Sequence, residues 1–375
     1  TAVDDGIRGK SYVAIKGGTI SLKVGGDGLK SDDTEIDKGY VFIENGVINI
    51  VSTGDAIDAE SDVVIEAGTF NLKSGGGSSS TARASAKGLQ ANVSIIINGG
   101  VFTIDSADDA VNSNGNITVN NGVFAISTGD DAFHADASLT INNGTIIITK
   151  SYEGLESVII TINGGTIHLV SSDDGINGAG GNDASGVLPG PGVWGRPGQD
   201  FFMNTGNCQL NINGGYIYVD SLGDGFDVNG AVTMTGGTVI INGPTSNMNG
   251  ALDHVSFKIT GGFLLAVGSS GMAMAPGTNS TQYSMMVNFN TAKSAGTLVN
   301  VQTSTGTVLF TFKPTKQYQS LVFSSPVLAV GTTYEIYYGG SVTGTVNDGL
   351  YAGGTYTPGT KYRSFTLSSI TTTIY

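Results

Sequence analysis

The phrase Asp108-Asp109-Ala110-Val111-Asn112 recurs three more times in the centre of this 375-residue chain. It returns as Asp130-Asp131-Ala132-Phe133-His134, Tyr152-Glu153-Gly154-Leu155-Glu156 and Asp173-Asp174-Gly175-Ile176-Asn177. The second acids fall at positions 109, 131, 153 and 174, so the steps between them are 22, 22 and 21 residues. A constant period of this size indicates a stacked repeat.

A second phrase, Ile-Asn-Gly-Gly or a close variant, keeps the same period. It ends at Gly100, Gly122 and Gly144, and each of these glycines precedes the second acid by 9 residues (109 − 100, 131 − 122, 153 − 144). Both phrases extend outward from the centre. The acid position runs Asp5, Asp27, Asp55, Lys87, Asp109, Asp131, Glu153, Asp174 and Asp224, and weakens at Gly250 and Ser270.

Apolar and polar residues alternate around each glycine pair, which is the period of a β-strand and not of a helix. Ile117 and Val119 alternate with Thr118 and Asn120, for example. Short strands separated by turns, with about 22 residues per circuit, predict an all-β fold, a parallel β-helix with three faces. We expect about ten coils that stack at about 4.8 Å and form a rod of roughly 50 Å.

The domain limits follow from where the period holds. We expect the β-helix over residues 1–275, with loop insertions at 74–85 and 178–207. From Thr278 onward the period is lost while strand-like runs remain, so residues 276–375 are predicted to be a β-rich C-terminal cap. One further column, Asn98, Asn120, Asn142, Asn163 and Asn213, lies two residues before the second glycine. These side chains either bond from coil to coil or simply suit the turn.

Charge and composition limit the partners and the location. The net charge of −14 disfavours nucleic acid and anionic membranes. The single cysteine, Cys208, excludes an internal disulfide and a cysteine-based metal site. No run is apolar enough for membrane insertion, no signal peptide remains at Thr1, and the composition suggests a mature, secreted or cell-surface protein. We expect a monomer.

Stacking brings acids at equal positions of neighbouring coils to about 5 Å from one another. Like charges this close are unfavourable unless protons or cations lie between them, and Ca²⁺ accepts irregular sets of oxygen ligands. In the same column, Lys87 stands where a fixed cation would replace a bound one. The candidate calcium ligands are Asp27, Asp55, Asp58, Asp108, Asp109, Asp130, Asp131, Glu153, Glu156, Asp173, Asp174, Asp224 and Asp227. The alternative is that these acids are solvated turn residues.

The sequence supports catalysis weakly and binding better. Cleavage of a polyuronide by elimination needs a lysine or arginine base, and the central coils hold only Lys87, Lys150 and Arg196. An apolar outward edge that includes Tyr216 and Tyr218 is either covered by the C-terminal domain or binds a sugar. Trp194, in the long insertion, is a further candidate for stacking. The candidate carbohydrate contacts are Trp194, Tyr216, Tyr218, Tyr152, His134 and Arg196.

The two phrases and the strand-rich tail resemble a family of secreted bacterial carbohydrate-binding proteins. The resemblance rests on Thr128–Ala135 (TGDDAFHA), Ile162–Ile167 (INGGTI), Ser171–Asn177 (SSDDGIN) and Gly331–Tyr337 (GTTYEIY), and it covers nearly the whole chain. It implies a right-handed, pectate-lyase-like parallel β-helix with bound calcium. It also implies binding of plant cell-wall polysaccharide, namely cellulose and polygalacturonate, without established cleavage.

Residues and resemblance together predict a non-catalytic, calcium-binding protein that recognises plant cell-wall polysaccharide. Calcium would hold the acidic turns together and could also bridge the protein to uronate carboxylates. Two alternatives stay open: a calcium-dependent pectate lyase, and a structural surface adhesin whose ligand is not a glycan.

Overall fold

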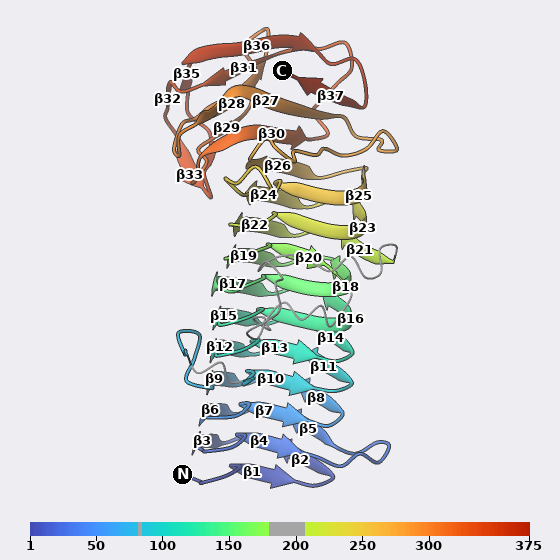
Figure 1. The fold of residues 1–375 in the computed structure, drawn as a ribbon, viewed down its shortest axis with the longest axis vertical. Coiled ribbons are helices and arrows are strands. Elements are labelled where there is room, and N and C mark those ends of the chain that lie inside the picture. Colours follow the sequence, from blue (N-terminus) through green and yellow to red (C-terminus); the bar gives the residue numbers. More distant parts are fainter. Residues whose placement is uncertain (82–84, 180–206) are drawn as a thin grey trace, which may run out of the picture.

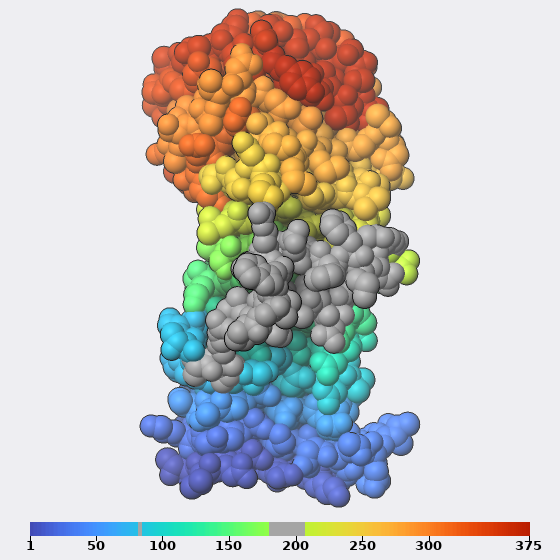
Figure 2. Space-filling model, viewed as in Figure 1, coloured from blue at the N-terminus to red at the C-terminus, as the bar shows by residue number. Residues whose placement is uncertain are grey.

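The protein is described here by a computed structural model of residues 1–81, 85–179 and 207–375, which contain strands and no helix (Figure 1). Parallel strands form three rows along the long axis, and each circuit of the chain, or coil, adds one strand to each row. Figure 2 shows the same progression from the N-terminal to the C-terminal end on the surface. The architecture is all-β with long parallel sheets, as a parallel β-helix requires, whereas its handedness and its number of coils stay predictions.

The first row consists of short strands that directly follow the acidic phrase. It contains β1 (Ile7–Gly9), β4 (Leu29–Ser31), β7 (Ile57–Ala59), β10 (Leu89–Ala91), β13 (Val111–Ser113), β20 (Ile176–Gly178) and the first parts of β16 (Phe133–Ile141), β18 (Leu155–Ile162), β23 (Phe226–Met234) and β25 (Leu252–Ile259). Partners are one repeat apart, as in Leu89 with Val111 and Val111 with Phe133.

The second row precedes the glycine pair. It contains β2 (Tyr12–Ile15), β5 (Tyr40–Ile43), β8 (Asp62–Ile65), β11 (Ser94–Ile97), β14 (Asn116–Val119), β21 (Cys208–Ile212) and the second parts of β16, β18, β23 and β25. The chain then turns at the second glycine, where Gly144 and Gly165 have φ angles of 123° and 87°. A Cβ at Gly144 would lie 2.8 Å from the carbonyl oxygen of Gly122, so both conformation and stacking require glycine here.

The third row follows the glycines and builds a separate sheet. It contains β3 (Thr19–Lys23), β6 (Val47–Ser52), β9 (Thr69–Ser74), β12 (Val101–Ser106), β15 (Val123–Thr128), β17 (Thr145–Lys150), β19 (Thr166–Ser171), β22 (Tyr216–Ser221), β24 (Thr238–Asn242) and β26 (Phe263–Gly268). Alternate residues point inward, and the Phe70, Phe102 and Phe124 rings stack at 4.6 Å between centroids. The predicted alternation is confirmed, since Ile117 and Val119 are fully buried.

The asparagine column forms hydrogen bonds from coil to coil. The side-chain amides of Asn120, Asn142, Asn163 and Asn213 each donate to the preceding asparagine, at 2.6, 2.7, 2.8 and 2.8 Å. Of the two interpretations that the sequence left open, the coil-to-coil ladder is therefore present.

The C-terminal strands extend the third-row sheet and cover its last parallel strand. The antiparallel strand β30 (Tyr318–Ser324) pairs with β26, and β27 (Ser284–Lys293) and β37 (Thr371–Ile374) follow. A second sheet comprises β28 (Val299–Thr303), β29 (Val308–Phe312), β31 (Thr333–Tyr338), β33 (Thr345–Asn347), β34 (Leu350–Ala352) and β36 (Thr360–Thr366), beside the pair β32 (Ser341–Val342) and β35 (Tyr356–Thr357). The domain limit at 275/276 and the insertion at 178–207 stay predictions. Within the described residues, no helix is long and apolar enough to cross a membrane.

Candidate functional site

The acids that precede the first row form a column in which most side chains support the next coil. In these cases, one carboxylate oxygen accepts a hydrogen bond from the backbone N–H of the equivalent residue one coil further on. These bonds run from Asp27 to Asp5 (3.0 Å), Asp55 to Asp27 (2.9 Å), Lys87 to Asp55 (2.6 Å), Asp131 to Asp109 (3.0 Å), Glu153 to Asp131 (2.9 Å), Asp224 to Asp174 (2.5 Å) and Gly250 to Asp224 (2.5 Å). The first role of these acids is therefore to hold the turn.

A second column of outward side chains lies three residues later, at the middle of each first-row strand. Its members are in register: Arg8, Lys30, Asp58, Gln90, Asn112, His134, Glu156, Asn177, Asp227 and Asp253. Several of them contact the second oxygen of the acid in their own coil. Lys30 Nζ lies 2.5 Å from Asp27 Oδ2, and Asn112 Nδ2 lies 2.9 Å from Asp109 Oδ2. The two columns thus face each other along the molecule.

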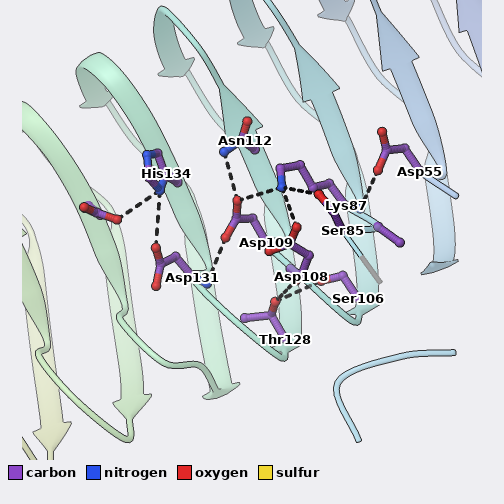
Figure 3. A network of polar contacts seen from close by, with 12 residues as sticks. Asp55, Ser85, Lys87, Ser106, Asp108, Asp109, Asn112, Thr128, Asp131 and His134 are labelled. Carbon is purple, nitrogen blue, oxygen red and sulfur yellow. Dashed lines mark hydrogen bonds and ion pairs between the residues drawn. The ribbon is translucent and has the colours of Figure 1, made fainter. Parts of the chain in front are cut away.

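Lys87 interrupts the acid column with a positive charge (Figure 3). Its Nζ lies 2.6 Å from Asp108 Oδ2 and 3.4 Å from Asp109 Oδ2. Burial alone would lower the pKa of Lys87, but Asp109 and Asp108 outweigh it and hold the pKa above its ordinary value. The group Asp108, Asp109 and Asp130, whose oxygens lie within 4.8 Å of one another, therefore already contacts an ammonium group at two of its members.

The most negative buried cluster lies one coil further on. Ligand atoms of Asp131, Glu153 and Glu156 lie within 4.8 Å of one another, and these residues are 1%, 2% and 0% exposed. His134 Nδ1 lies 2.9 Å from Glu156 Oε2 and 3.3 Å from Asp131 Oδ2, and its Nε2 lies 3.3 Å from Asp136. Burial alone would lower the pKa of His134, but these carboxylates raise it above its ordinary value, which favours the imidazolium form of the ring.

One imidazolium does not neutralise this cluster. Burial and the nearby Asp131 raise the pKa of Glu156 well above its ordinary range. In the neighbouring group of Asp108, Asp109 and Asp130, burial, with Asp131 and Asp109 close by, raises the pKa of Asp130 to about 9. The cluster must therefore bind protons or a further cation.

Asn177 adds a neutral oxygen to the same place. It pairs in register with Glu156 and is fully buried, and neither its Nδ2 nor its Oδ1 has a hydrogen-bond partner among the described residues. A buried amide without a partner is costly, and its Oδ1 is a suitable ligand for a hard cation. Asp131, Glu153 and Glu156 thus offer carboxylate oxygens of the kind that Ca²⁺ prefers, and Asn177 lies on the strand beside Glu156.

The other predicted ligands lie in different surroundings. Asp27 and Asp58 both contact Lys30, with Asp58 at 2.8 Å from Nζ. The pKa of Asp173 lies above its ordinary value, because burial raises it more than the hydrogen bond from Tyr152 lowers it. Asp224 and Asp227 form a second possible oxygen group with Asp253. Some predicted ligands along the columns thus contact a lysine, and others lie close to further acids.

The predicted carbohydrate contacts are not gathered in one place. Tyr216 and Tyr218 pack against C-terminal residues, and the Tyr216 hydroxyl donates to Asp348 at 2.7 Å. Asp348 also lies 2.8 Å from His168 Nε2. Tyr152 and His134 lie near the acid columns instead, and Trp194 and Arg196 lie outside the described residues. Of the two interpretations of the apolar edge, covering by the C-terminal domain accounts for Tyr216.

Three residues in or beside these columns were not predicted as site residues from the sequence: Asn177, Asp136 and Asp253. The signal for Asn177 and Asp253 was the position three residues after the acid, which the period carries through every coil. Asp136 belongs to no repeated position of the sequence. Its role is visible only in the structure, where it contacts the side chain of His134.

Comparison with known proteins supports carbohydrate binding. Residues 1–132 match the model of a family described as carbohydrate-binding domain-containing protein. This segment covers β1 to β15, about a third of the chain. No curated protein and no solved structure matches the sequence.

Proposed function

We propose that this protein is an extracellular, non-catalytic, calcium-binding protein that recognises plant cell-wall polysaccharide, with cellulose and polygalacturonate as its ligands. The observation that carries the carbohydrate part is the family match over residues 1–132. The observation that supports calcium is the buried cluster of Asp131, Glu153 and Glu156, in which one histidine faces several carboxylates.

Calcium in this cluster has a structural role. Asp131 receives the N–H of Glu153, and Glu156 and Asn177 are paired across neighbouring coils, so a cation here joins three successive coils. Since it binds only the folded chain, it raises the free energy of unfolding. Residues outside this cluster are then free to contact the glycan.

The same geometry argues against elimination chemistry at the acid columns. A lyase base must accept a proton, so it has to be neutral when it acts. Burial alone would lower the pKa of Lys30, but hydrogen bonds to Asp27 and Asp58 raise it above its ordinary value. Lys87 is held charged in the same way by Asp109 and Asp108. Neither lysine suits the role of base.

A pull-down on insoluble cellulose and on pectin, with calcium and with chelator, tests the glycan part. We expect binding to both materials in calcium, without release of ultraviolet-absorbing unsaturated uronides. Release of such products would establish the lyase instead. Absence of binding to every glycan, together with adhesion to cells, would favour the adhesin.

Thermal melting tests the calcium part, with two variants of Asp131. Chelator should lower the melting midpoint of the wild type, because the cluster then repels itself. Asp131→Asn retains an oxygen to accept the Glu153 N–H but removes a charge, so it should blunt the chelator effect. Asp131→Ala should blunt it too and should also lower the midpoint, since it loses the hydrogen bond. A wild-type midpoint that is the same in calcium and in chelator contradicts the calcium site.

A further inference from the structure

The outward face of the third row is hollowed near the N-terminal end. A groove of about 510 Å³ runs over β3, β6, β9 and β12, on the sheet face opposite the core. These strands lie next to one another in Figure 1, at the end of the molecule away from the C-terminal strands. All four lie within residues 1–132, the segment that matches the carbohydrate-binding family.

A column of polar side chains runs along the groove. Ser21, Asn49 and Asn71 are paired in register across β3, β6 and β9. Asn71 Nδ2 donates to Asn49 Oδ1 at 2.8 Å, and Asn49 Nδ2 donates to Ser21 Oγ at 3.4 Å. Each amide has a second N–H and a second carbonyl lone pair. The column can therefore donate to and accept from the hydroxyl groups of a sugar chain that lies along the stack.

Positive charge lines the edge of the same groove. Lys23, Val51, Lys73 and Asp105 form the neighbouring outward column, and Lys23 and Lys73 are both exposed. The Nζ of Lys73 lies 2.6 Å from Asp105, so the lining carries two positive charges and one negative charge. This is an unusual balance on a protein of net charge −14. Two lysines on alternate coils are separated by about 10 Å, twice the strand spacing.

Two of the three basic residues that the sequence analysis named in the central coils have partners outside the groove. Lys87 contacts Asp108 and Asp109, and Lys150 Nζ donates to the carbonyl oxygen of Ser78. Arg196 lies outside the described residues. Exposed ammonium groups beside a row of amides are therefore found at Lys23 and Lys73 and not at the positions expected.

We propose that this groove binds a uronate-containing glycan chain, with carboxylates on Lys23 and Lys73 and hydroxyl groups on Asn49 and Asn71. The assignment rests on the proposed carbohydrate-binding function and gives it a location. Recognition here is by direct charge pairing, so it does not require calcium, unlike a calcium bridge between acidic surfaces. Lysine paired with carboxylate across an exposed groove is screened by salt, so the affinity falls as ionic strength rises.

Titration calorimetry with a defined oligogalacturonate tests the groove, in chelator and at a temperature below the melting midpoint. The double variant Lys23→Ala/Lys73→Ala should bind about tenfold or more weakly than the wild type, because two charge-assisted contacts are lost. Lys258→Ala is the matched control. This lysine is also exposed but lies on β25, in the second row, so binding should be unchanged. Asn71→Ala should weaken binding to a lesser degree, and Lys73→Arg should retain it.

Two further measurements distinguish failure of the groove assignment from failure of the proposed function. A neutral cello-oligosaccharide distinguishes charge pairing from loss of the surface, since its binding should not respond to the lysine variants. Melting curves of all variants establish that each is folded. If the wild type binds oligogalacturonate and the double variant binds it equally well, or if chelator abolishes binding by the folded wild type, the groove assignment is wrong. If the wild type binds neither oligogalacturonate nor cellulose, the proposed function fails with it.

Discussion

Lys87 and Asp131 occupy equivalent positions in the acid column, and their different chemistry sets the character of their coils. Lys87 supplies an ammonium to Asp108 and Asp109 within the chain itself. Asp131 instead adds a charge to a cluster that already holds Glu153 and Glu156. The residue at this position therefore decides whether a coil carries its own cation, as at Lys87, or holds only a further acid, as at Asp131, where we propose that calcium binds.

Removing the charge of Lys87 tests whether this residue neutralises the acids of its coil. Lys87→Met leaves two carboxylates without their ammonium, and we expect a loss of about 3 kcal/mol in the free energy of unfolding in chelator. Calcium should recover part of this loss, because a cation can then replace the amine. Lys73→Met is the control, since its pair with Asp105 is exposed and should cost at most about 1 kcal/mol. Equal effects of the two substitutions would contradict the role of Lys87.

Asp55 gives the column a dependence on pH. Burial raises its pKa from 3.8 to about 7, so the folded chain binds a proton more tightly than the unfolded chain. Stability in chelator should therefore fall as the pH rises from about 4 to about 7, the interval in which only the folded state holds this proton. Asp55→Asn retains an acceptor for the Lys87 N–H and cannot titrate. Its melting midpoint should decline less over this interval, and a parallel decline would show that other groups dominate.

At the scale of the elements, the fold was predictable because the repeat period determines the features that recur in every coil. The inward residues, the asparagine ladder and the turn at the second glycine follow from strand alternation and a 22-residue step. The direction in which the acid side chains point could not be predicted from strand alternation, because the chain bends at Ala110 or Ala132 just after them. The structure shows that one oxygen of an acid such as Asp109 accepts a hydrogen bond from the next coil, and that the residue three positions later contacts the other oxygen.

The groove was unpredictable for a related reason. Strand alternation puts polar residues such as Asn71 on the outward face of the early coils, but it does not show that this face is hollowed. What distinguishes it is the missing cover. C-terminal strands pack over Tyr216, Tyr218 and Phe263 at the other end, a contact between residues more than a hundred positions apart. No local pattern encodes such a contact.

The asparagine ladder should contribute measurably to the stability of the second glycine turn. Asn142 donates to Asn120 at 2.7 Å and accepts from Asn163 at 2.8 Å. Asn142→Ala removes both bonds, and we expect a loss of about 2 kcal/mol in the free energy of unfolding. Asn143→Ala, the exposed neighbour outside the ladder, is the matched control and should change stability little. Denaturant titration of both variants measures the difference.

At the scale of the whole molecule, the C-terminal strands protect an edge. β30 pairs antiparallel with β26, the last parallel strand of the third row, and buries Leu265 and Ile240 beneath the C-terminal core. An open, apolar strand edge of this kind is a template for pairing with another chain. The third row and the C-terminal strands β30, β27 and β37 thus form one continuous sheet across the predicted domain limit.

A chain that ends at residue 275 should therefore associate with itself. Light scattering after gel filtration should show oligomers for the truncated chain and a smaller particle for the full one. Leu265→Lys in the truncated chain places a charge on the exposed face and should reduce association. A truncated chain that stays monomeric at the same concentration would count against the protective role of β30.

The stacking of coils also determines how the molecule responds to being stretched. Strands run across the long axis, and the hydrogen bonds between coils lie along it, so a pull on the two ends loads those bonds one coil at a time. An opened coil of 22 residues, such as the one that separates the partners Leu89 and Val111, releases about 75 Å of extended chain. Drawn by its ends between a cell and an anchored fibre, such a protein would lengthen in steps set by the length of each coil and stay folded beyond the point of opening.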